Sequence, residues 1–277
     1  NVNANISGGT IKVEGNWTSS GSGFDPTGGT VEFSGSAAQT ISLASGNNFY
    51  DLTINNSNAT EKVSAQGSSL VVSNHLNIAD GIFESASDYH DVTIATGSSL
   101  QLTGDITVSG NWTNNGTFTP GTHKVSFDGN SLQTVSGNNT FYRLKINKLS
   151  GEVSISGTIA VSNNLNLAGG LINLNTNTLD FYSVTNFNNG GSSSHIYNGH
   201  SSKNYTSTTA FTYPIGDGTN FRPITLTSST TNSNNISAAY MFANQNQSSL
   251  NSSLSSIETY GWDIQRSTGT DGFTITI

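Results

Sequence analysis

The residues of this chain that could do chemistry are acids and histidines in a few small groups. Asp88, Tyr89, His90 and Asp91 form the one tight grouping of carboxylates with an imidazole. Enzymes that cleave polysaccharides place such carboxylates for acid–base work. The corresponding stretch of a later repeat, 179–182, lacks the histidine. We therefore expect strand and turn roles for these side chains and predict no catalytic residue.

Two further groups could bind a metal ion. His195 and His200 lie in a stretch rich in Gly and Ser, with no third ligand nearby in sequence, which makes a zinc site improbable. Asp217 shares a tight loop with Gly216 and Asn220, whose oxygens could hold calcium. The spacing lacks the EF-hand pattern, and a turn capped by Asp217 is the favoured interpretation. The sequence predicts no cofactor, with calcium at Asp217 as the open alternative.

Composition excludes several classes of protein. The 277 residues include 17 acids and 9 bases, a formal net charge of -8, which disfavours nucleic acid and anionic lipid as partners. The chain has no cysteine, which excludes a thiol nucleophile, an iron–sulfur cluster and a disulfide framework. No apolar run approaches the roughly 20 residues that span a bilayer. Only 33% of residues are hydrophobic, so a long, thin β core is expected.

An internal duplication organises most of the chain. The segment GNWTSSGSGFDPTGGTVEFSG from Gly15 returns as GNWTNNGTFTPGTHKVSFDG from Gly110. In the same order, QTISLASGNNFYDLTIN from Gln39 returns as QTVSGNNTFYRLKIN from Gln133. We infer a repeat of about 90–95 residues, with copy one near 1–105 and copy two near 106–200.

Short runs of alternating apolar and polar residues fill both copies, which is the pattern of β-strands. By this alternation Trp17 and Trp112 occupy equivalent inward positions, and so do Tyr50 and Tyr142. All four side chains are expected to be structural core residues.

The intervening positions are predicted to face solvent because they change between the copies. Asp51 in the first copy corresponds to Arg143 in the second, which reverses the charge. Strict alternation places Phe49 and Phe141 on this same outer face.

Two asparagines help to choose between a sandwich and a solenoid. In VVSNHLNI and AVSNNLNL, alternation turns Asn74 and Asn163 inward. An inward amide is costly in a sandwich core, whereas at the corner of a stacked coil it can bond to the neighbouring rung. The sequence therefore favours an all-β fold, a parallel β-helix (β-solenoid) built from the duplicated unit.

The pattern changes after residue 200. The strands in 201–277 look longer and have no counterpart upstream, so we expect a β-sandwich-like domain there. Its last strand, GFTITI, has no closing turn, and this predicts a domain that is cut short. The first residues, NVNANISGGT, lack a signal-peptide pattern, so we expect a mature protein or part of a larger one.

The blocks GNWTNNGTFTPGTHKVSF, QTVSG and FYRLKIN, with YPIGDGTNFRPITL and GWDIQRSTGTDGFTITI further on, resemble large secreted surface proteins of Bacteroidetes. The resemblance covers nearly the whole chain and implies a β-helical, adhesin-like protein exported by the type IX secretion system, in some cases linked to gliding motility. It implies an extracellular or cell-surface location and carries no catalytic residues. The sorting domain usual at the C-terminus in that family is missing here.

The leading hypothesis is a non-catalytic structural or adhesive module, a stiff repeat stalk that displays or spaces other domains. Its partners would be secretion machinery or other surface proteins, with surface polysaccharide as a further candidate. The alternative is a carbohydrate-active β-helix enzyme, which would need an acidic cleft on neighbouring coils, or a glycan-binding module with Thr and Asn ladders. Ice binding is disfavoured because strict T-x-T repetition is missing.

Overall fold

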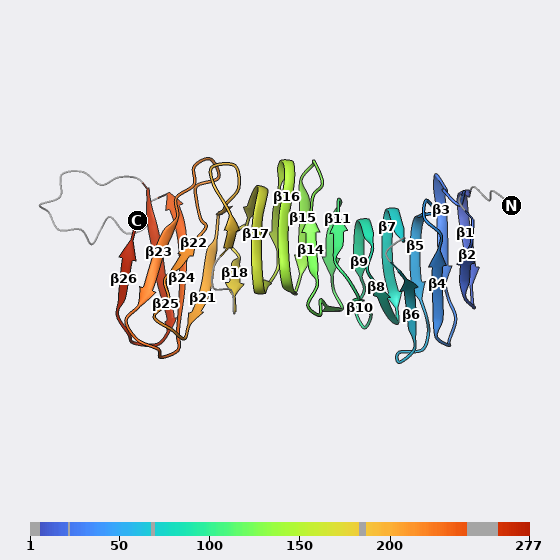
Figure 1. Ribbon diagram of the computed structural model, residues 1–277, viewed down its shortest axis with the longest axis horizontal. Helices are drawn as coiled ribbons and strands as arrows, with labels where there is room; N and C mark the ends of the chain where they lie inside the picture. The colour runs from blue at the N-terminus through green and yellow to red at the C-terminus, as the bar shows by residue number, and fades with distance from the viewer. Residues whose placement is uncertain (1–5, 22, 68–69, 183–186, 243–259) are drawn as a thin grey trace, which may run out of the picture.

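The chain winds into a β-solenoid of about 10 turns that ends in antiparallel strands (Figure 1). The computed structural model describes residues 6–21, 23–67, 70–182, 187–242 and 260–277, and these contain no helix. The expected parallel β-solenoid is confirmed. The N-terminal coils and the antiparallel strands lie at opposite ends of an elongated molecule (Figure 1).

The strands of the solenoid form three parallel faces and recur in a fixed order along the chain, with faces 1 and 2 formed from the first coils and face 3 from β7 (Val71–Asp80) onward. Face 1 consists of β1 (Ser7–Val13), β3 (Gly28–Phe33), β5 (Phe49–Asn55), the later parts of β7 and β9 (Asp88–Ile94), β12 (Trp112–Asn114), β15 (Gln133–Gly137), the ends of β16 (Asn139–Ser156) and β17 (Ile159–Asn173), and β20 (Ile196–Tyr197).

The other two faces follow the same winding. Face 2 contains β2 (Trp17–Ser19), β4 (Gln39–Leu43), β6 (Lys62–Gln66), β8 (Ile82–Ser85), β10 (Ser99–Leu102) and β13 (Thr117–Thr119), followed by the starts of β16 and β17, then β18 (Thr178–Phe181) and β21 (His200–Tyr205). Face 3 contains the starts of β7 and β9, then β11 (Ile106–Val108), β14 (Lys124–Phe127), the middles of β16 and β17, and β19 (Phe187–Asn189).

The last coil passes directly into antiparallel structure. β21 pairs in parallel with β18 on one side and antiparallel with β24 (Asn234–Phe242) on the other, and β24 pairs with β25 (Tyr260–Thr268). β22 (Phe211–Tyr213), β23 (Ile224–Ser228) and β26 (Phe273–Thr276) form a separate three-stranded antiparallel sheet. The Tyr213 hydroxyl donates to the Ile236 carbonyl, and Tyr205 packs against Phe273, which joins the two sheets as a sandwich.

The two sequence copies are stacked coils that are offset by one face. β2 pairs with β4 just as β12 pairs with β15, so Trp17 lies opposite Ile41 and Trp112 opposite Val135. The first pair lies on face 2 and the second on face 1. The length of one repeat therefore falls one third of a turn short of a whole number of turns. As a result, equivalent residues of the two copies point in different directions.

Aromatic clusters recur in the core of both copies. Trp17 packs against Phe24 and Phe49 at centroid distances of 5.1 and 5.6 Å. Trp112 packs against Phe118 and Phe141 at 4.8 and 6.0 Å. Trp112 is fully buried and its indole N–H donates to Asn139 Oδ1 (2.7 Å). Trp17 points inward but is only partly buried, because the first coil described has a neighbour on one side.

The core positions expected for Tyr50 and Tyr142 are wrong, although the following residues of the same face, Leu52 and Leu144, are buried as the alternation predicts. Both tyrosines are only half-buried, whereas Phe49 and Phe141 are fully buried. The pairing register shifts just after each phenylalanine, where the chain turns a corner: from face 3 to face 1 after Phe49, and from face 2 to face 3 after Phe141. A corner breaks the two-residue period, so alternation cannot be carried across it.

The inward positions expected for Asn74 and Asn163 are wrong for the same reason. Asn163 is exposed, and the half-buried Asn74 donates to Asp51 Oδ1 (2.6 Å). A register shift between Val72 and His75 marks the corner that places Asn74 outside the regular alternation.

Other amides fill the role that was expected of those asparagines. Gln39 is buried and its amide nitrogen donates to the carbonyls of Val13 (2.9 Å) and Gly15 (2.7 Å) in the preceding coil. Its oxygen accepts the Gly35 N–H at 3.2 Å. Gln133 makes the same three contacts in copy two, with Val108, Gly110 and Gly129. We name these two arrangements the glutamine clamps.

Replacing Trp112 by Ala should lower the free energy of unfolding by about 3–5 kcal/mol, because a fully buried indole is lost and Asn139 loses its donor. Trp17→Ala is the matched control and should cost less, since Trp17 is only partly buried. Urea unfolding followed by circular dichroism measures both. An equal or larger loss at Trp17 would contradict this account of the core.

Candidate functional site

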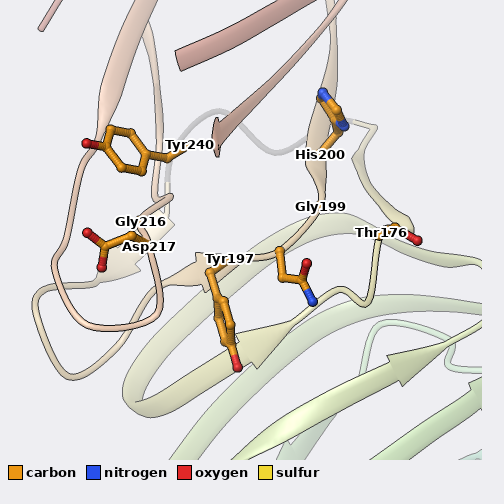
Figure 2. Close-up of a pocket in the computed structure, with 8 residues that line it drawn as sticks. Thr176, Tyr197, Gly199, His200, Gly216, Asp217 and Tyr240 are labelled. Atoms are coloured by element: carbon orange, nitrogen blue, oxygen red, sulfur yellow. The ribbon is translucent and has the colours of Figure 1, made fainter. Parts of the chain in front are cut away.

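The residues best placed to bind a ligand gather where the last coil meets the antiparallel strands (Figure 2). They surround a cavity of about 420 Å³, which we call the junction cavity. Its lining comes from the β17–β18 turn, the β20–β21 turn, the β22–β23 loop and β24. The lining residues are Thr176, Tyr197, Asn198, Gly199, His200, Gly216, Asp217 and Tyr240.

The fold brings together residues that are far apart in sequence. Figure 2 shows Tyr240 near Asp217 on one side of the junction cavity and His200 near Thr176 on the other. Asp217 and His200, which the sequence singled out separately, both belong to this lining. Thr176 and Tyr240 carried no sequence signal, because nothing in their local patterns reveals that a sandwich strand closes over the last coil.

Asp217 is held by the turn that the sequence predicted. Its Oδ1 accepts the backbone N–H groups of Thr219 (2.8 Å) and Asn220 (2.6 Å). Arg222 Nε lies 3.9 Å from Oδ2. Burial opposes ionisation, but these donors and the guanidinium together hold the pKa of Asp217 below its usual value.

Calcium at Asp217 remains a prediction that the loop itself does not support. The groups around the carboxylate are N–H donors and a guanidinium, whereas calcium takes oxygen ligands. Among the described residues, no three His, Cys, Asp or Glu side chains come together in a way that could hold a metal ion.

The two histidines serve different contacts. His195 is buried, its Nδ1 lies 3.0 Å from the Gly191 carbonyl, and the Gly218 N–H donates to its Nε2 (3.2 Å). Burial lowers the pKa of His195, against the opposing effects of the Gly191 carbonyl and the Asp217 charge. His200 Nε2 lies 3.0 Å from Asp263 Oδ2 in β25. His195 therefore supports the loop from beneath, and His200 links the lining to the antiparallel sheet.

The Asp88–Asp91 group makes contacts within and between coils. Tyr89 is buried and its hydroxyl donates to Ser85 Oγ, and burial raises the pKa of this phenol. Asp91 Oδ1 accepts the Asn111 N–H (2.5 Å) of the next coil. His90 Nδ1 lies 3.1 Å from Ser109 Oγ. In these contacts Asp91 and the imidazole of His90 each engage other groups of the stack and do not form an acid–base pair.

The rim of the junction cavity contains unusual backbone. Thr176 and Asn198 have positive φ angles of 69° and 57°, and the neighbouring Asn175 has 47°. A β-branched residue in this region is strained by about 1–3 kcal/mol. Such strain is most often found at ligand clamps and active sites, so it is independent support for a site here.

Glu152 ties the lining to the solenoid. The Tyr197 hydroxyl donates to Glu152 Oε2 (2.5 Å), and Asn173 Nδ2 donates to Oε1 (3.1 Å). Asn198 Nδ2 in turn donates to Asn173 Oδ1 (2.9 Å). This chain of hydrogen bonds fixes one wall of the junction cavity to face 1 of the coil.

A second unusual group lies outside the cavity. Lys148 is only 4% exposed, and its ammonium donates to the carbonyls of Gly129 and Ser131 and to Gln133 Oε1. Burial lowers the pKa of Lys148 to about 8, against the opposing charge of Asp128. In copy one the corresponding residue is Asn56, which donates to Gln39 Oε1. Lys148 is thus a charged extension of one glutamine clamp.

The fold and this site define the chain as a parallel β-solenoid with an antiparallel end that encloses a small cavity. Comparison with known protein families, with curated proteins and with solved structures gave no match. No helix in the part of the chain that the structure describes is long and apolar enough to cross a bilayer.

Thr176→Gly should raise the free energy of unfolding by about 1 kcal/mol, because glycine adopts the positive φ of this position without strain. Thr178→Gly, in the adjacent regular strand β18, is the control and should be destabilising. Thermal unfolding distinguishes the two variants. A stability loss in both would contradict strain at the rim.

Lys148 should make stability depend on pH in the alkaline range. Its pKa is about 8 in the folded chain against an ordinary 10.5, so the unfolded chain binds the proton more tightly between these values. The stability of the protein relative to a Lys148→Met variant should therefore rise by about 2 kcal/mol from pH 7 to pH 10. Urea unfolding of both proteins at both pH values measures this rise. Parallel pH profiles would show that the lysine is not desolvated.

Proposed function

We propose that the chain is a non-catalytic structural and adhesive module, a stiff stalk that holds an antiparallel end domain away from its point of attachment. The observation that carries this proposal is the stack of parallel coils from β1 to β21, whose strands pair coil to coil along face 1 from β1 to β20 and on face 2 from β18 to β21. One apolar core runs through these coils and continues into the antiparallel end as far as Ile236 and Ala238.

The stiffness would come from backbone pairing between successive coils and from the two glutamine clamps. Backbone ladders connect each turn to the next, and the glutamine clamps tie the corners of adjacent turns through buried hydrogen bonds. Bending such a stack would break several of these bonds at once, each worth about 1 kcal/mol. A narrow solenoid with this construction suits a spacer.

The proposed location is extracellular or at the cell surface, and its support is the resemblance to secreted surface repeat proteins of Bacteroidetes. Export by the type IX system and a role in adhesion or gliding belong to the same proposal. A composition rich in hydroxyl and amide side chains, with only 9% charged residues and no cysteine, is compatible with it.

The alternative, a carbohydrate-active enzyme, draws less support from the geometry. The sequence places its best acid group at Asp88 and Asp91, on adjacent faces of one coil. Asp91 is engaged by a backbone N–H of the next coil, and no general acid stands opposite it among these contacts. Glycan binding without cleavage remains compatible with the stalk.

Small-angle scattering of the whole chain and an activity screen test the proposal together. We expect the scattering of a rod, with a constant cross-section, and no release of sugar from pectin, alginate, chitin or xylan. The matched variants for the screen are Asp88→Asn and Asp91→Asn. The curve of a flexible chain would contradict the stalk, and turnover that either variant abolishes would establish the enzyme instead.

A further inference from the structure

The junction cavity combines aromatic and uncharged polar groups in one small volume. Tyr197 and Tyr240 provide rings, Thr176 a hydroxyl and Asn198 an amide, and the turns provide backbone groups. At about 420 Å³ it falls within the range of about 300–1,000 Å³ that is usual for small-molecule sites. A ligand that fits must therefore present both an apolar surface and several hydrogen-bonding groups.

The rings of the cavity are held in place by neighbours. Trp262 meets Tyr240 edge to face at a centroid distance of 5.3 Å, and the guanidinium of Arg222 lies 5.9 Å from the same ring. On the opposite wall, Glu152 fixes the Tyr197 hydroxyl. Prearranged rings and amides reduce the entropy that binding would otherwise cost.

The charge of the lining selects against anions. Among the lining residues, Asp217 is a carboxylate and none is Lys or Arg, and the guanidinium of Arg222 lies outside the lining at 3.9 Å from Asp217 Oδ2. Phosphates, sulfated sugars and uronic acids would lie beside this negative charge. A pyranose without charge meets no such repulsion, and it offers a C–H face for an aromatic ring and hydroxyls for the amide and carbonyl groups.

We propose that the junction cavity binds a single neutral pyranose residue, free or at the end of a glycan. Asn198 presents its amide at the rim, with the orientation fixed by its donation to Asn173 Oδ1 (2.9 Å). Asn198 and Thr176 have positive φ angles, and this backbone strain is what it takes to place the Asn198 amide and the Thr176 hydroxyl at the rim of the cavity. The site would give the stalk a specific contact at its antiparallel end, and it does not depend on whether the solenoid acts as a spacer.

The test uses the whole chain and methyl glycosides of glucose, galactose, mannose and N-acetylglucosamine, with methyl glucuronide as the anionic contrast. Asn198→Gly keeps the left-handed backbone and removes the amide. Asn189→Gly is the matched control, because Asn189 also has a positive φ (63°) and also donates to an asparagine of the preceding coil, Asn166. Saturation-transfer NMR and calorimetric titration provide the readouts.

We expect at least one neutral glycoside to bind, with an affinity about tenfold lower in Asn198→Gly and unchanged in Asn189→Gly. Methyl glucuronide should bind at least about tenfold more weakly than the neutral sugar. The proposal is overturned if no neutral glycoside binds, if both variants lose affinity equally, or if the glucuronide binds as tightly. Rod-like scattering would be unaffected by any of these results, so failure here is distinguishable from failure of the stalk.

Discussion

The structure depends on one constraint: the backbone N–H and C=O groups that point inward at the corners of a narrow solenoid must find hydrogen-bond partners. The glutamine clamps meet this constraint. Gln39 and Gln133 each accept one N–H and donate to two carbonyls of the preceding turn, so every polar atom of the side-chain amide is used. An apolar residue at either position would remove three hydrogen bonds to backbone groups, each worth about 1 kcal/mol.

The offset of the two copies by one face changes how the repeat is used. Equivalent core residues such as Trp17 and Trp112 pack alike, because every corner encloses the same interior. Equivalent surface residues point in different directions and meet different neighbours. Asp51 accepts from Asn74, whereas Arg143 pairs with Asp105 at 3.1 Å. The reversal of charge between the copies therefore accompanies a change of side on the solenoid, and the copies do not build one shared surface.

The antiparallel end differs from the coils in what it can hold. Within the stack, side chains fill the interior, and outward residues bond to their neighbours along the ladders. β21 pairs in parallel with β18 and antiparallel with β24, so the solenoid ends there and no further coil of the described chain stacks on it. The junction cavity lies at this change of pairing, with its wall tied to the solenoid through Glu152 and its rim made of left-handed residues. A binding function is more compatible with this end than with the coils.

The sequence by itself determined the β class, the duplication and the buried Trp112, because composition and short-range alternation record strand formation and core burial directly. The predicted solenoid is confirmed, but the inward positions of Asn74 and Asn163 that favoured it over a sandwich are wrong. The sequence also identified the Asp217 turn, whose hydrogen bonds are local. Only the tertiary structure decided which residues lie at corners, and so the burial of Phe49 and the exposure of Asn163, because alternation loses its phase at each bend. The meeting of Thr176, His200 and Tyr240 was likewise decided by the tertiary structure, since contacts between distant turns leave no periodic trace in the sequence.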